Sequence, residues 1–324
     1  MSWREVARRD VLSVYRSRTG PAVAALVALF TVVPVGLMAL AADVVMVAAV
    51  GGVITVGALL GLVFFGTPRS IAAYVVVFTG LAVLWTAAIA NPQNPPDMHL
   101  AVIGVGGGLS LVVPIVAMLA SYAAIVGERT TGSVRFLFGL PNSRQGAYAA
   151  KYLSRAGIVC VPLVVGLLLA AVIVGASFEN GSFFGMLGLL FVTLPYALCF
   201  VGVGLAASAW ADTDNLAVAV VVSVYALLRA GWPSAQWLAI EMSAAEHYEE
   251  PAWYFWFGRV NPMNAYARLM GEFVPDDGFP LVTMPDEGVA PIATSAEFAL
   301  LVVVVWAVLA PLVGLGYVRH RDFL

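Results

Sequence analysis

Long apolar runs are the feature that most limits how this chain can fold. A helix that crosses a bilayer needs about 20 mainly apolar residues. Only 11% of the 324 residues are charged, whereas a soluble domain carries about 25%. The sequence therefore predicts an all-α, polytopic membrane helix bundle that forms a single transmembrane domain over residues 1–324. The expected spans lie near 21–42, 44–65, 71–90, 100–126, 156–176, 183–210, 215–232 and 296–317.

The second and third of these spans are the least secure. Asp43 alone separates the first run from the second. Because a carboxylate is costly in hydrocarbon, we expect Asp43 to mark a hairpin tip at the membrane surface. Either both 44–65 and 71–90 cross or neither does, so six and eight spans both stay open. The orientation of the later spans is the same in either case.

Basic residues gather on one predicted side of the membrane. With the N-terminus inside, thirteen of the sixteen Lys and Arg residues lie in inner segments, and only Arg229, Arg259 and Arg268 lie outside. Thirteen of the nineteen acidic residues fall outside, so the net charge is +7 inside and −10 outside. Cytoplasmic loops carry an excess of Lys and Arg. We therefore expect a multi-pass protein of the cell membrane with both termini cytoplasmic.

Residues 1–20 have the pattern of an elbow helix that lies on the inner leaflet. Apolar residues recur at helical spacing while the arginines mostly fall elsewhere, as in interfacial amphipathic helices. A cleavable signal would instead need a shorter apolar region and a small-residue cleavage site. A simple anchor for the first span and an elbow that moves with it both remain open. The apolar positions are Trp3, Val6, Ala7, Val11, Val14 and Tyr15.

The longest inner loop, residues 127–155, mixes polar and apolar residues. Ser133 can cap a short helix that Pro141 ends. Phe136, Leu137 and Leu140 share one face of that helix. Such a face must pack on the membrane, on the parent protein or on a partner. Asn142 or Ser143 can then cap a second helix, which carries Arg155 and Lys151, the chain's single lysine, into the next span.

This loop resembles the signature of ABC-2 type permeases, GER-x-x-G-[ST] followed by LP-x-SR. The matching residues are Gly127-Glu128-Arg129, Gly132-Ser133 and Leu140-Pro141-Asn142-Ser143-Arg144. The subgroup that it resembles includes the permease of the nitrous oxide reductase maturation system. Further similar stretches are SWREVARRD at the start, PAWYFWFGRVNPMNAYARL before the last span and GYVRHRDF near the end. Together the similar segments are spread over nearly the whole chain.

The resemblance implies the membrane half of an ABC transporter, with six helices per protomer and two protomers per transporter. It identifies the loop as the coupling helix that docks on an ABC ATPase subunit. The expected partners are that ATPase, a second permease protomer in a homo- or heterodimer, and the lipid bilayer, with no nucleic acid. The residues that it assigns to ATPase coupling are Glu128, Arg129, Thr131, Gly132, Ser133, Arg135, Phe136, Leu137, Leu140 and Pro141.

The sequence contains no G-x-x-x-x-G-K-[ST] motif, which a P-loop needs to hold ATP phosphates. The glycine cluster at 104–110 has no lysine and suits close helix packing. His99, His247 and His320 have no metal-ligand spacing. We therefore expect that this chain is not an enzyme on its own, and that it binds no cofactor or metal. ATP and Mg²⁺ would be bound by the partner ATPase.

The longest outer segment, residues 233–295, is rich in acidic and aromatic residues. We expect two short re-entrant or amphipathic helices there, one of them over 263–273. They could form a cargo-exit vestibule, a docking patch or a solvated acidic cap. Arg229, near the outer end of its span, could reach the head groups or pair with an outer-loop glutamate. The candidate outer-gate residues are Arg229, Trp253, Trp256 and Arg259.

These features predict a permease subunit that moves an unidentified substrate across the cell membrane, in the export direction, driven by a separate ATPase. Two alternatives come from other classes. An ion-coupled secondary carrier would usually keep an ionisable residue at mid-membrane depth, and the sequence places none clearly there. A non-transporting membrane scaffold would use 127–144 only to recruit a partner.

Overall fold

The computed structural model describes residues 3–16, 19–40, 97–130, 143–178, 180–242, 251–273 and 290–320. The predicted spans 44–65 and 71–90 lie outside these ranges, as does the predicted coupling helix at 133–140. In the described part, five stretches are helical, long and apolar enough to cross a membrane. They are Met98–Thr130, Arg144–Ser177, Phe183–Trp210, Asp214–Met242 and Ala296–His320. The prediction of an all-α, polytopic helix bundle is confirmed.

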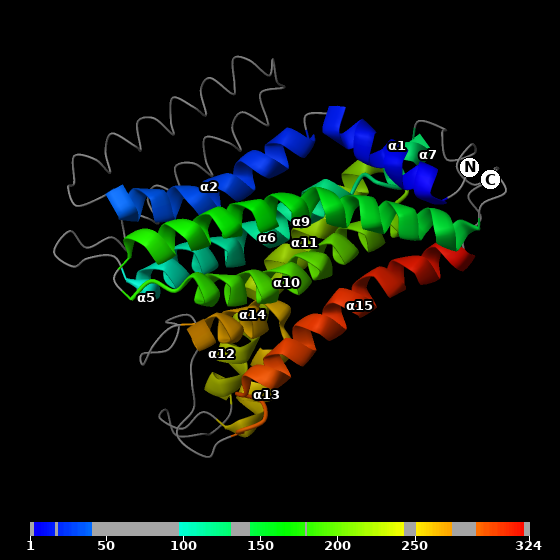
Figure 1. Cartoon of the computed structure of the whole chain (residues 1–324). Helices are drawn as coiled ribbons and strands as arrows, with labels where there is room; N and C mark the ends of the chain where they lie inside the picture. The colour runs from blue at the N-terminus through cyan, green and yellow to red at the C-terminus, as the bar shows by residue number, and fades with distance from the viewer. Residues whose placement is uncertain are drawn as a thin grey trace.

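Figure 1 shows these helices as one elongated bundle. The elements are α1 (Trp3–Arg16), α2 (Thr19–Leu40), α5 (Met98–Ala101), η1 (Val102–Gly107), α6 (Gly108–Ser121), α7 (Val126–Thr130), α9 (Arg144–Ser177), α10 (Phe183–Trp210), α11 (Asp214–Ala226), η2 (Leu227–Gly231), α12 (Trp232–Met242), α13 (Ala252–Val260), α14 (Pro262–Met270), η3 (Gly271–Phe273) and α15 (Ala296–His320). Both η1 and η2 are π-helical turns, and η3 is a 3₁₀ turn.

Helix α10 forms the centre of the bundle and packs against α6, α9 and α15. Tyr196 and Phe200 on α10 are fully buried. At Gly202 the backbone of α15 comes so close that a Cβ would lie 2.9 Å from the nitrogen of Pro311. The missing side chain thus lets the last span lie directly on the central one, so α15 and α10 form the tightest seam of the fold.

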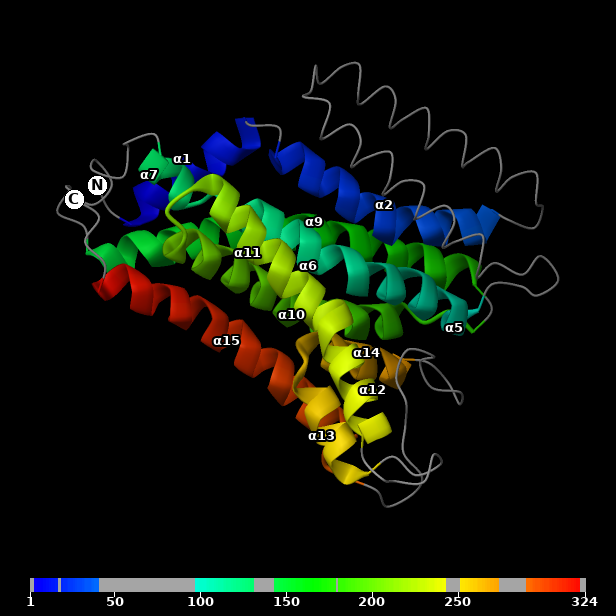
Figure 2. The ribbon, with the colours of Figure 1, turned by 180° about the vertical axis from the view of Figure 1, so that it is seen from behind.

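The two ends of the bundle differ. One end, here called the elbow end, holds α1, α7, the start of α9, the turn between α10 and α11, and the last turns of α15. The N- and C-terminal parts of the chain also lie together there (Figure 1). At the other end, the cap end, α12, α13 and α14 lie against the start of α15 (Figure 2). These ends carry the polar contacts described below.

The helices depart from the expected spans in two places. Helix α9 begins at Arg144, because Ser143 caps it by accepting a hydrogen bond from Gly146 N at 3.0 Å. The helix that begins at Asp214 runs on through η2 to Met242, ten residues past the predicted end of that span at 232. The π-turn η2 ends at Gly231, two residues before Pro233, whose ring would clash with a regular helix. At the cap end, three helices are found where two were expected.

Candidate functional site

Lys151 occupies the centre of the elbow end. It lies two turns into α9, where its side chain is 3% exposed. Its Nζ donates to Asp10 Oδ1 of α1 at 2.7 Å and to Glu128 Oε1 of α7 at 2.5 Å. Asp10 is 5% exposed and Glu128 20% exposed. One ammonium group therefore joins three helices that are far apart in the sequence.

The next turn of α9 adds a second cation. Arg155 Nη2 donates to Asp10 Oδ1 at 3.1 Å, and its Nη1 donates to the carbonyl of Ala120 at 3.1 Å. Ser154 Oγ donates to the other oxygen of Asp10. We call Asp10, Glu128, Lys151 and Arg155 the ion cluster. Its two carboxylates and two cations give a net charge of zero. Buried charges are tolerated only when they are paired in this way.

The pKa of Asp10 reports the balance of forces in the ion cluster. Burial alone would raise it, because it disfavours the charged form. The charges of Lys151 and Arg155, with the hydrogen bonds from Lys151 and Ser154, outweigh burial and hold the pKa of Asp10 below its usual range. The carboxylate of Asp10 is thus ionised at neutral pH.

The residues before Glu128 are fixed to the end of α10. Ser208 Oγ accepts from the backbone N–H groups of Ile125 and Val126 at 2.9 and 3.1 Å. Arg129 Nη1 donates to the carbonyl of Ala211 at 2.5 Å and meets Asp212 Oδ1 at 3.3 Å. Asp212 is 69% exposed, so that ion pair adds little beyond the carbonyl contact. Helix α7 is therefore fixed to α9 by Glu128 and to α10 by Arg129.

Helix α1 is more than a membrane anchor. Val6, on its apolar face, is buried against Ala147 and Ala150 of α9. Val11 and Leu12 are 39% and 44% exposed and leave an apolar strip on the outside. The helix thus joins the bundle through Val6 and Asp10 and keeps a surface for lipid.

Two of the expected coupling residues, Glu128 and Arg129, lie in this site. The other eight lie outside the described residues: Thr131, Gly132, Ser133, Arg135, Phe136, Leu137, Leu140 and Pro141. Sequence reasoning missed Asp10 and did not assign Lys151 or Arg155 a role. Two features of the sequence could have indicated this pairing. Lys151 is the single lysine of the chain and precedes an apolar run, and Asp10 is the one aspartate in an arginine-rich helix. Their sequence separation of 141 residues hid the pairing.

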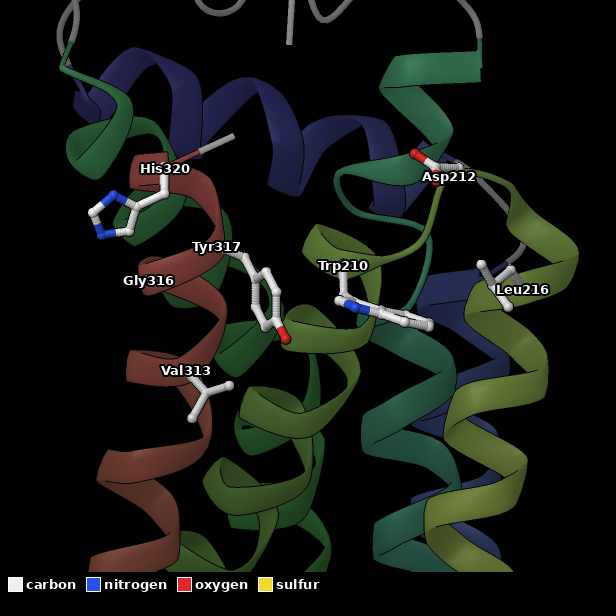
Figure 3. A pocket seen from close by; sticks show the side chains of 7 residues that line it. All are labelled: Trp210, Asp212, Leu216, Val313, Gly316, Tyr317 and His320. Atoms are coloured by element: carbon white, nitrogen blue, oxygen red, sulfur yellow. The ribbon is translucent and has the colours of Figure 1, made fainter. Parts of the chain in front are cut away.

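An open groove of about 630 Å³ also lies at the elbow end, between α11 and α15 over the last turn of α10. In Figure 3, Trp210 and Tyr317 line its middle, while Asp212 stands at the turn that Arg129 contacts. Its remaining lining residues are Leu216, Val313, Gly316 and His320. The cap of α11 is Thr213, whose Oγ1 accepts the hydrogen bond from Leu216 N at 3.3 Å.

The cap end holds its cations differently. Arg259 is 4% exposed and donates through Nε to the carbonyl of Ala293 at 3.0 Å. Burial and the nearby charge of Arg268 lower the pKa of Arg259 to about 10, so it stays protonated at neutral pH. Asn261 donates to the carbonyl of Leu228 at 2.7 Å, and its Oδ1 accepts from Met263 N at 2.9 Å. Asn261 therefore joins α14 to the π-turn η2.

The four candidate outer-gate residues are not gathered into one site. Trp253 and Trp256 lie on α13 and are 41% and 40% exposed. The ring of Trp256 meets Phe298 of α15 edge-on at 5.0 Å. Arg259 is buried in the same helix, whereas Arg229 is exposed on η2. Among the described residues, no hydrogen bond or ring contact is recorded between any two of the four.

Comparison with known proteins agrees with this geometry. Residues 85–322 match the model of a family described as ABC-2 family transporter protein. No curated protein matches the chain. The matched region takes in the whole of the predicted coupling loop at 127–155, all of α9 to α15 and every residue of the ion cluster except Asp10. The chain belongs to the ABC-2 family of transporter proteins, as a multi-pass membrane permease.

Proposed function

We propose that this permease exports its substrate across the cell membrane, with both termini cytoplasmic, driven by a separate ABC ATPase subunit that binds ATP and Mg²⁺. Two such protomers, identical or different, enclose the transport path. The likeness of the loop signature to the permease of the nitrous oxide reductase maturation system is part of the proposal. The observation that supports it most is the ion cluster, which joins α1 and α7 to α9. Helices α7 and α9 are the elements that come before and after the 131–142 segment in the chain.

Force applied to that segment reaches the spans through rigid joints. On its N-terminal side, α7 is held by Glu128 and Arg129. On its C-terminal side, the segment leads into the start of α9, which Ser143 caps. A coupling helix with Phe136, Leu137 and Leu140 in a groove of the ATPase would therefore move α9 and α10 together. Arg135, Glu128 and Arg129 would orient it by charge, while Thr131, Gly132, Ser133 and Pro141 would set its two ends.

Typical free energies support a rigid connection between α1, α7 and α9. Taking a gate from mostly closed to mostly open needs about 5.5 kcal/mol of differential binding. Breaking one partner out of a buried ion pair costs about 3–5 kcal/mol. That cost is of the same order as the free energy the gate needs, and the ion cluster contains two cations and two carboxylates, which favours helices that stay joined under such a load.

Co-purification tests this proposal. The tagged chain is extracted from its native membranes in mild detergent, and bound proteins are sequenced by mass spectrometry. We expect a protein with a Walker A motif, and we expect Leu137→Asp to lose it while the permease level in the membrane is unchanged. Leu137→Met, which keeps size and hydrophobicity, is the matched control and should retain it. Retention of the ATPase by Leu137→Asp would refute docking through this face.

Reconstitution separates the alternatives. Vesicles that hold the permease with the ATPase should transport only when ATP is supplied. Transport without the ATPase, in response to a proton or sodium gradient, would instead support an ion-coupled carrier. A bound ATPase with no ATP-dependent transport would support a scaffold.

A further inference from the structure

Among the spans that the structure describes, the least buried one carries a single charge far from both of its ends. Only 17% of the most apolar stretch of Asp214–Met242 is buried, the lowest share among the five spans. Its charged residues are Asp214, Arg229 and Glu241. At 1.5 Å per residue, Asp214 and Glu241 lie about 40 Å apart, close to the thickness of a bilayer with its head groups.

Arg229 therefore lies near the middle of the membrane. It is about 22 Å from Asp214 and about 18 Å from Glu241 along the helix. The predicted span ended at 232, which had placed Arg229 near the outer surface. Because the helix continues to Met242, its guanidinium is exposed on the outside of the protomer at a depth where contact with lipid is strongly unfavourable. This face must therefore meet water, a counter-charge or another protomer.

The turn that carries Arg229 is held in place by contacts with α13 and α14. Leu228 accepts a hydrogen bond from Asn261 at 2.7 Å. Trp232 stacks on Phe257 with ring centroids 4.7 Å apart and donates to the carbonyl of Phe257 at 3.0 Å. No carboxylate forms an ion pair with Arg229 in the ranges that the structure describes. The residue also lies in a π-turn, a distortion that is frequent at functional sites.

The charge of Arg229 acts on Tyr225 and Tyr196, and apolar side chains are exposed on the same helix. Leu227 is 57% exposed, and Val222, two turns earlier, is 59% exposed. A single cation between exposed apolar side chains suits a molecule with an anionic group on an apolar body. Guanidinium groups bind carboxylates and phosphates through paired, charge-assisted hydrogen bonds.

We infer that Arg229 lies on the transport path and binds the anionic group, a phosphate, sulfate or carboxylate, of an amphipathic substrate. This inference rests on the proposed function, since it takes the exposed face of Asp214–Met242 to be the one that encloses the path. In a dimer of identical protomers, two such guanidinium groups would lie along it.

The binding test uses native mass spectrometry of the purified permease in an uncharged maltoside detergent. The probes are dodecyl phosphate, dodecylphosphocholine and inorganic phosphate. We expect adducts with dodecyl phosphate, and Arg229→Gln should weaken them about tenfold, the loss of one charge-assisted hydrogen bond. Arg229→Lys should keep most of the binding. The matched control is Arg319→Gln, which removes another exposed arginine and should change nothing.

Other outcomes of this test overturn the inference. Equal binding of dodecylphosphocholine would show that the negative charge is not recognised. Binding of inorganic phosphate alone would exclude an amphipathic ligand. Equal losses in Arg229→Gln and Arg319→Gln would mean non-specific charge attraction. The ATPase is scored in the same Arg229→Gln preparation, so unchanged dodecyl phosphate binding with the ATPase retained refutes the inference and leaves the proposed function standing.

An accessibility test checks the environment of position 229 independently. In membrane vesicles, Arg229→Cys in a Cys160→Ala, Cys199→Ala background should react with a negatively charged methanethiosulfonate, which needs water. Val161→Cys, on the exposed face of α9 at 62% exposure, is the lipid-facing control and should stay unreactive. Failure of the Arg229→Cys variant to react would place Arg229 in lipid and overturn the inference.

Discussion

The elbow end and the cap end are fastened by different kinds of polar contact. At the elbow end, Asp10 and Glu128 meet Lys151 and Arg155, so charged side chains from separate helices pair with one another. At the cap end, side chains mostly donate to backbone carbonyls. Arg259 bonds to Ala293, Asn261 to Leu228 and Trp306 to Val260 at 2.7–3.0 Å.

The difference has an energetic consequence. Removing one member of a buried ion pair leaves an uncompensated charge, which costs more than the pair contributes. Removing one donor to a carbonyl costs only about 1–3 kcal/mol. Helices α1, α7 and α9 should therefore move as one unit without coming apart, while the cap end can lose and remake single contacts. This difference in polar contacts suits a permease in which, as proposed, the ATPase acts at the elbow end and the transport path opens at the cap end.

The largest expected effect comes from Lys151→Met. It leaves Asp10 and Glu128 without their shared cation and should lower the free energy of unfolding by about 3–5 kcal/mol. Thermal unfolding in detergent measures it. Arg319→Met removes an exposed cation from the same end and should have almost no effect. Equal midpoints for the two variants would mean that the ion cluster does not hold the elbow end.

Acid should lower the stability of the elbow end before that of the cap end. The expected loss is smaller than that of Lys151→Met, because Glu128 keeps its pairing with Lys151. The pKa of Asp10 is lowered in the folded protein. Its contribution is therefore complete above its unfolded value of 3.8 and is lost as the pH falls below that value toward the folded pKa. Unfolding midpoints between about pH 2 and pH 5 should show this loss in the wild type and less of it in Asp10→Asn. Identical pH profiles would rule out the pairing.

At the cap end, Asn261→Ala removes both the bond to Leu228 and the cap of α14. We expect a loss of about 2 kcal/mol, since each such contact contributes about 1 kcal/mol. Asn261→Ser keeps an acceptor for Met263 N but cannot reach Leu228, so it should fall midway. Unfolding midpoints of the three proteins measure the series. If Asn261→Ala cost more than Lys151→Met, the contrast between the two ends would be reversed.

The smallest effect should come from Trp306→Phe, which keeps the aromatic ring and loses the Nε1 bond to Val260 at 3.0 Å. The expected loss is about 0.5–1 kcal/mol. The change in midpoint, compared with Asn261→Ala in the same detergent, checks it. A loss as large as that of Lys151→Met would show that single carbonyl contacts are not exchangeable at the cap end.

Local patterns in the sequence predicted the helices well. Residues 183–210 form α10 with the expected bounds, and Ser143 caps α9 as one of the two proposed residues. Apolar length and a capping side chain are local properties, so a single sequence carries them. The same is true of the resemblance at Glu128 and Arg129, whose neighbours in the chain form the signature.

Contacts between distant residues could not be predicted in this way. Asp10 lies in a helix whose pattern suggested a membrane surface, and only the fold brings it to Lys151. Arg229 and Pro233 resembled the end of a span, because a charge and a proline usually stop one. Arg229 lies within the π-turn η2, through which the helix continues to Met242, so the charge is far from the end of the helix and not close to it as expected.

The central claim is that α1, α7 and α9 move as one body when the ATPase acts. Double electron–electron resonance tests it in the reconstituted transporter, with spin labels at Arg9→Cys and Ala149→Cys, or at Arg9→Cys and Arg319→Cys, after replacement of Cys160 and Cys199 by alanine. Labelled protomers are diluted with unlabelled ones. We predict that trapping ATP changes the distance between positions 9 and 319 and leaves the distance between positions 9 and 149 unchanged. A change between positions 9 and 149 as large as that between 9 and 319 would contradict the account.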